Sequence, residues 1–216
     1  MDYLRAVEAM IPGARGQVLG ALTRDTSAQT IRQVSLSAGV SWSQTAQVIE
    51  DLAGLGIVER RSTPGAILVR LAPGNVAAGV IQALTDLRTS AIEALRQEAT
   101  WITPTPLSLI VFGSFARGEA RRDSDVDVVA VRDPATVAGR VEDDLWVESV
   151  GRWVGASRSI TGNTVNLIDL DLSELHPAGR KTPSWLRDAS KDGIVIAGSP
   201  LPDLIDSQKG HRTAHA

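Results

Sequence analysis

Apolar residues in the first third of the chain recur at helical spacing in three segments and then alternate in two. The three helical segments are Gly13–Leu22, Thr30–Leu36 and Ser41–Gly54, and the two alternating segments are Ile57–Arg61 and Ala66–Leu71. Pro64-Gly65 separates the alternating pair, and alternation around a Pro-Gly turn is typical of a β-hairpin. Residues 1–73 are therefore predicted to form three helices followed by a hairpin.

A long amphipathic pattern follows over residues 74–103 and predicts a linker helix. Prolines at 104 and 106 end it, because the residue before a proline disfavours helical backbone. Over residues 104–200 strand and helix patterns mix, which predicts a second domain with a mixed sheet flanked by helices. Residues 201–216 are polar and predict a disordered tail. The predicted fold class is α+β, and a length of 216 residues suits two small domains.

Composition narrows the function classes. The chain is 43% hydrophobic and 22% charged with a net charge of −3, as in globular proteins, and the sequence has no apolar run long enough to predict a membrane partner. The first residues lack a secretory pattern, which favours the cytoplasm. The absence of cysteine excludes disulfides, thiol catalysis and cysteine-ligated zinc. Two of the three histidines lie in the last six residues, so a histidine-based active site is not expected.

The most informative stretch is Val111–Val131, VFGSFARGEARRDSDVDVVAV. An apolar strand pattern breaks at Gly113-Ser114, and ten residues separate Ser114 from Asp125. Asp125 and Asp127 are two apart in a second strand pattern, so both carboxylates point to one face. Paired carboxylates repel each other and favour a hard cation such as Mg²⁺ or Mn²⁺. The Gly-Ser step offers backbone N–H groups to phosphate, so the stretch predicts a site for a metal-bound nucleoside triphosphate.

The segment GSFARGEARRDSDVDVV resembles the signature of polymerase-β-like nucleotidyltransferases, particularly the minimal nucleotidyltransferases. The resemblance implies Mg²⁺-dependent transfer of a nucleoside monophosphate, AMP from ATP, to an acceptor hydroxyl. A partner toxin protein and a small molecule are both acceptors that it allows. It also implies that Asp125 and Asp127 are catalytic metal ligands and that Gly113, Ser114 and Arg117 bind the nucleotide.

In that family a third acidic residue from a later strand completes the metal cluster. The candidate strand is TVNLIDLDL, and one alignment puts Asn166 at the acidic position while a shifted alignment puts Asp169 there. Strand parity places these two residues on opposite faces unless a bulge intervenes. We expect Asp169 to be the third catalytic residue and metal ligand.

The phrase VSWSQTAQVIEDLAGLGIVERR, together with the hairpin, resembles the winged helix-turn-helix domain of bacterial regulators. The resemblance implies that the third segment is the recognition helix, which reads double-stranded DNA in the major groove, and that arginines of the hairpin contact phosphates. The implied DNA-binding residues are Ser41, Trp42, Ser43, Gln44, Thr45, Arg60 and Arg61. Residues 1–72 hold seven arginines against six acidic residues, so a protein-docking or homodimerisation role stays open. The alternative function is a DNA-binding regulator whose nucleotidyltransferase-like domain only senses nucleotide or docks a partner.

Overall fold

The computed structural model describes residues 1–137, 139–175 and 183–213, with side chains as far as Ser207. The chain divides into two compact units. The N-terminal unit is Asp2–Leu87, and the C-terminal unit is Arg88–Ala216 together with Met1. Among the described residues, no helix combines the length and the hydrophobicity needed to cross a membrane.

The N-terminal unit contains the predicted helices and hairpin, preceded by one further short helix. Its three strands form an antiparallel sheet in the order β1-β3-β2. The elements are α1 (Ala6–Met10), α2 (Gly13–Arg24), β1 (Gln29–Thr30), α3 (Ile31–Ala38), α4 (Trp42–Gly54), β2 (Val58–Thr63), β3 (Ala66–Leu71), α5 (Val76–Ala83) and the 3-10 helix η1 (Leu84–Asp86).

Local sequence explains where these helices begin and end. Thr30 forms a capping box with Gln33 at the start of α3, and Gly39 ends that helix in the left-handed conformation with φ of 66°. The Ser41 hydroxyl accepts a hydrogen bond from the backbone of Gln44 and so caps α4. The apolar faces of α2, α3 and α4 then close one buried core around Leu22.

The C-terminal unit is built on a four-stranded mixed sheet, as the sequence predicts. The strand order is β6-β5-β4-β7, with β5 and β6 parallel and the other neighbours antiparallel. The elements are α6 (Leu87–Ala99), β4 (Ser108–Phe112), α7 (Gly113–Arg117), β5 (Val126–Arg132), α8 (Arg140–Thr161), β6 (Val165–Asp171), the 3-10 helix η2 (Leu172–Leu175), α9 (Ser184–Asp192), β7 (Ile194–Gly198) and α10 (Leu201–Thr213).

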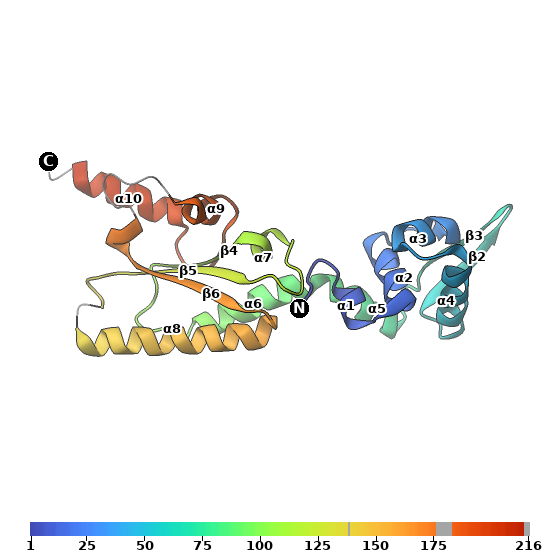
Figure 1. Ribbon diagram of the computed structural model, residues 1–216, viewed down its shortest axis with the longest axis horizontal. Helices are drawn as coiled ribbons and strands as arrows, with labels where there is room; N and C mark the ends of the chain where they lie inside the picture. The colour runs from blue at the N-terminus through green and yellow to red at the C-terminus, as the bar shows by residue number, and fades with distance from the viewer. Residues whose placement is uncertain (138, 176–182, 214–216) are drawn as a thin grey trace. The chain divides into compact units, whose positions relative to one another are not determined.

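Helices cover both faces of this sheet (Figure 1): α6 and α8 lie on one face and α9 and α10 on the other. Alternate residues of β5 serve the two sides, as strand geometry requires. Val129 and Val131 pack in a cluster with Leu186 of α9 and Leu201 of α10. Asp127 lies two residues before Val129 in the same strand, so its side chain points to the face of the sheet that α9 covers.

Two predictions about the connecting regions need correction. Residues 74–103 do not form one helix, because η1 separates α5 from α6 and the two units divide at Leu87. Residues 201–213 form α10 rather than a disordered tail. The reason is that three apolar side chains of this mostly polar segment pack in the core. Leu201 is buried, and Leu204 and Ile205 pack against the cluster that contains Val129 and Val131. Residues 214–216 of the predicted tail lie outside the described residues.

Candidate functional site

The two aspartates of the motif lie at the start of β5, next to the end of β4. In the antiparallel pairing Phe112 of β4 is opposite Asp127, so Gly113 and Ser114 begin α7 directly beside the carboxylates. Asp127 is half-buried and Asp125 is exposed, which leaves the pair open to a ligand. The sheet thus brings together the two halves of the motif that ten residues separate in sequence.

Only glycine fits the junction between β4 and α7, and Gly113 occupies it. Its φ is +74°, a conformation that L side chains rarely adopt, and a Cβ there would lie 2.6 Å from Asp127 Oδ2. The backbone turn and the carboxylate are therefore in direct contact. A ligand held by the turn is consequently within reach of the carboxylate as well.

Asn166 completes the polar cluster. The parallel pairing of β5 and β6 sets it opposite Asp127. Its side-chain amide donates hydrogen bonds to Asp125 Oδ2 at 3.1 Å and to Asp127 Oδ1 at 3.4 Å. Both carboxylates therefore converge on one neutral amide, on the face of the sheet that Asp127 occupies.

The surroundings of Asp127 disfavour the ionised form of its carboxyl group. Burial raises the pKa of its carboxyl above the ordinary value, and the neighbouring Asp125 charge raises it further. The hydrogen bond from Asn166 and the charge of Arg117 act in the opposite direction and lower that pKa. A carboxylate that is desolvated and repelled in this way is poised to gain from a bound cation.

Arg117 lies at the end of α7 on the exposed surface. Its guanidinium donates to Glu119 at 2.9 Å, and this bond is the main reason that its pKa is raised. The structure thus brings Arg117 close enough to act on the charge of Asp127, while the guanidinium itself is paired with Glu119. An anionic ligand would have to compete with Glu119 for it.

Two residues that the motif does not contain hold its loops in place. Arg88 of α6 donates to the carbonyl of Ala116 at 2.6 Å and so fixes the end of α7. The buried Asn163 donates to the carbonyls of Arg121 and Ser124, which fixes the turn that leads into Asp125. Sequence reasoning missed both, because each acts on backbone far from it along the chain and belongs to no local pattern.

The prediction that Asp169 joins the aspartate pair is wrong. Asp169 differs in parity from Asn166 along β6, so it points to the other face of the sheet, toward α8. There both of its carboxylate oxygens accept from the indole N–H of the buried Trp146, at 3.2 and 3.1 Å. Among the described residues, no group of three histidine or acidic side chains could hold a metal ion. No bulge occurs in the β5–β6 pairing to change that parity.

Replacing Asp169 with alanine is expected to destabilise the C-terminal unit without affecting nucleotide binding. The indole N–H of Trp146 would lose its acceptor. Because Asp169 is exposed, water can reach the indole N–H in the variant, so the expected loss is about 1 kcal/mol of unfolding free energy. Chemical denaturation followed by tryptophan fluorescence measures this loss, and Asp169→Asn, which keeps an acceptor, is the matched control. A large fall in Mg²⁺-dependent nucleotide affinity would instead show that Asp169 takes part in metal binding.

The predicted DNA-contacting residues of the N-terminal unit lie mostly on one exposed stretch. Ser41, Ser43 and Gln44 are exposed at the start of α4, and Trp42 is 60% exposed. Thr45 is different: it is fully buried, so the prediction that it reads DNA is wrong. It lies one turn further along α4, on the side that packs into the core of the unit.

The hairpin arginines are largely paired with acidic neighbours. Arg60 forms an ion pair with Glu50, and Arg70 forms one with Glu59 at 2.9 Å. Arg61 is exposed and makes no ion pair with any described residue. Of the two predicted phosphate-contacting arginines, Arg61 is thus the one with an uncommitted charge.

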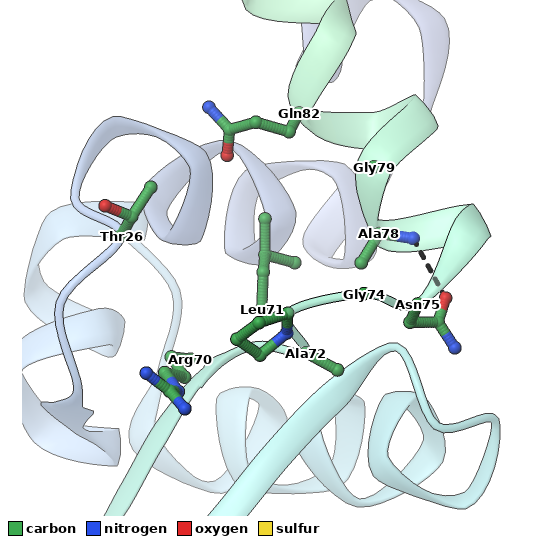
Figure 2. A pocket seen from close by; sticks show the side chains of 10 residues that line it. Thr26, Arg70, Leu71, Ala72, Gly74, Asn75, Ala78, Gly79 and Gln82 are labelled. Carbon is green, nitrogen blue, oxygen red and sulfur yellow. Dashed lines mark hydrogen bonds between the residues drawn. The ribbon is translucent and has the colours of Figure 1, made fainter.

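A cavity of about 370 Å³ lies in the N-terminal unit, between the end of β3 and the start of α5 (Figure 2). Three of its polar side chains already have partners. Asn75 caps α5 by accepting from the backbone of Ala78, Arg70 is paired with Glu59, and Gln82 donates to the carbonyl of Thr23. These contacts all lie within the N-terminal unit, so they explain why these polar side chains are there without a bound ligand.

Comparison with known proteins agrees with the character of the C-terminal site. Residues 92–153 match the family model of the nucleotidyltransferase domain, a segment that contains Gly113, Ser114, Asp125 and Asp127. No curated protein matches the sequence.

The solved structures that match this chain are distant in sequence and have low TM-scores. A toxin–antitoxin structure with AMP-PNP is 19% identical, with 59% of this chain and 90% of that chain covered and a TM-score of 0.32. A putative nucleotidyltransferase from Sulfolobus solfataricus is 19% identical, with 51% and 82% covered and a TM-score of 0.30. TrmBL2, an archaeal chromatin protein, is 18% identical, with 87% and 75% covered and a TM-score of 0.30.

Proposed function

We propose that the C-terminal unit binds a nucleoside triphosphate together with Mg²⁺ and has the arrangement for nucleotidyl transfer, with ATP as donor. The observation that carries the proposal is the convergence of Asp125 and Asp127 beside Gly113, where the backbone leaves no room for a side chain. The nucleotidyltransferase match over the same residues supports it.

The residues present fit a hard divalent cation. Mg²⁺ is commonly held by one or two carboxylates, with substrate phosphates supplying further oxygens. Asp125 and Asp127 provide those carboxylates. A bound cation would offset the desolvation and the repulsion from Asp125 that disfavour the ionised form of Asp127. A bound Mg²⁺ would neutralise charge on the triphosphate and on the leaving pyrophosphate.

The remaining roles fall to the turn and its neighbours. Backbone N–H groups at Gly113 and Ser114, with the serine hydroxyl, bind the β- and γ-phosphates, and Arg117 adds positive charge. In the reaction an acceptor hydroxyl oxygen bonds to the α-phosphorus while the bond from that phosphorus to the bridging oxygen of the β-phosphate breaks. Pyrophosphate leaves with the electron pair. A hydroxyl on a partner toxin protein is one acceptor that this chemistry allows.

A fluorescent ATP analogue tests this proposal. We expect the analogue to bind in Mg²⁺, to be displaced by unlabelled ATP and to be released by EDTA. Competition with GTP, CTP and UTP then measures the preference for the base. Binding that EDTA leaves intact would contradict the role of the aspartate pair.

A second function, DNA binding by the N-terminal unit, is favoured by the exposed residues at the start of α4. We propose that the unit acts as a winged helix, with Ser41, Trp42, Ser43 and Gln44 facing the major groove and Arg61 contacting a phosphate. Hydroxyl and amide groups suit base edges, and the exposed indole of Trp42 is available for apolar contact in the groove. In this function the nucleotide site would serve as a sensor.

Replacing Arg61 with alanine is expected to weaken binding to a mixed-sequence DNA duplex. Loss of one phosphate contact should make the slope of log K against log[salt] shallower by about 0.9. Fluorescence anisotropy over a range of salt concentrations measures both effects. Arg152→Ala removes an exposed arginine of the C-terminal unit and is the control; equal effects of the two variants would show that only the net charge matters.

A further inference from the structure

Asn166 occupies the place next to the aspartate pair where a further negative charge would have the largest effect. Its amide reaches both carboxylates, at 3.1 and 3.4 Å. Asn166 and Asp125 are exposed and Asp127 is half-buried, so all three can contact a ligand. The cluster therefore consists of two negative charges and one neutral amide.

We propose that Asn166 restricts this site to a single divalent cation, so that the site retains a nucleoside triphosphate and transfers its nucleotidyl group very slowly. The main outcome at the site is then a nucleotide-bound protein rather than a modified acceptor. This inference rests on the proposed binding of metal and nucleotide at Asp125 and Asp127.

Charge balance is the first reason. The two carboxylates balance the charge of one divalent cation. A second cation would have to be held by the nucleotide phosphates alone, without a further negative charge from the protein, so it would bind much more weakly than the first. An amide supplies no net charge. It can offer its oxygen to one cation after rotating its side chain, and this adds a ligand without adding attraction.

Proton balance is the second reason. When the acceptor oxygen bonds to the α-phosphorus and pyrophosphate leaves, the hydroxyl proton must pass to a base. An amide nitrogen is not a base at neutral pH, so Asn166 cannot accept that proton. Asp169 is bonded to Trp146 on the opposite face of the sheet, and Glu119 is paired with Arg117. With Asp125 and Asp127 engaged by the cation, the proton passes to water, which is a slow route.

The test counts the ions that bind. Mn²⁺ is titrated into the full chain with a non-hydrolysable ATP analogue, and free Mn²⁺ is followed by electron paramagnetic resonance. We expect one tightly bound Mn²⁺ per wild-type chain and two in Asn166→Asp. Asn166→Ala removes the amide without adding charge and should still bind one ion, which separates the effect of charge from that of a changed side chain.

A second readout follows pyrophosphate release from ATP with water as the acceptor. Asn166→Asp is expected to raise this rate at least about a hundredfold, which is the lower end of general-base contributions. Two ions in the wild type, or one ion and an unchanged rate in Asn166→Asp, would overturn the inference while leaving the proposed nucleotide site intact. Absence of any metal-dependent nucleotide binding in the wild type would overturn the proposed function itself.

Discussion

Replacing both Asp125 and Asp127 with asparagine is expected to abolish Mg²⁺-dependent nucleotide binding while the fold is kept. The double variant keeps the shape of the cluster and one acceptor oxygen at each position but loses both negative charges. Mg²⁺ binding depends on carboxylate charge, so we expect the affinity for Mg²⁺-ATP to fall at least about a hundredfold, which corresponds to about 2.7 kcal/mol. Calorimetric titration with ATP in excess Mg²⁺ measures this change.

The same double variant should be no less stable than the wild type. The pKa of Asp127 is raised in the fold, chiefly by burial, so its ionised form disfavours the folded state at pH values above that pKa. Neutral asparagine removes this cost, and the thermal unfolding midpoint at neutral pH should stay the same or rise. The pair Asp144→Asn with Asp203→Asn removes two exposed charges elsewhere in the unit and is the control. Unchanged binding in the double variant at 125 and 127 would show that these groups do not hold the metal.

Replacing Gly113 with alanine is expected to be damaging both to stability and to binding. A left-handed backbone costs an L residue roughly 1–2 kcal/mol, and here the added Cβ would also collide with Asp127 Oδ2 at 2.6 Å. Relief of that collision must move either the Gly113-Ser114 turn or the carboxylate. We therefore expect loss of at least about 1–2 kcal/mol of unfolding free energy and a matching loss of Mg²⁺-ATP affinity.

Gly151→Ala is the matched control for this variant. Gly151 lies inside α8, with no atom within 4 Å of an added Cβ. In a helix interior alanine is favoured over glycine by roughly 0.5–1 kcal/mol, so this variant should be slightly more stable and bind nucleotide normally. If Gly113→Ala behaved like Gly151→Ala, the close approach of backbone and carboxylate would be irrelevant to the site.

Sequence patterns predicted the three helices and the hairpin of the N-terminal unit and the mixed sheet of the C-terminal unit, because the apolar spacing and the turn residues agree locally. Thr30 and Ser41 cap helices where the pattern begins them, and the paired strands around Pro64-Gly65 form the hairpin. The aspartate pair and the Gly-Ser turn were likewise readable, because both lie within one short stretch of sequence.

The predictions that failed depended on contacts between distant segments. The two alignments for the third acid could not be separated along the chain, whereas the pairing of β6 with β5 puts Asn166 beside the aspartates and turns Asp169 toward Trp146. Thr45 follows four exposed residues, and only the packing of α4 shows that it is buried. The anchoring roles of Arg88 and Asn163 depend on backbone carbonyls that no local motif marks.

The most direct test of the account is calorimetric titration of the wild-type chain with ATP, first with Mg²⁺ and then with EDTA. We expect saturable binding of one ATP per chain in Mg²⁺ and loss of that binding in EDTA. Equal binding under the two conditions would mean that the aspartate pair holds no metal. Absence of binding under both would show that Gly113, Asp125 and Asp127 do not form a nucleotide site.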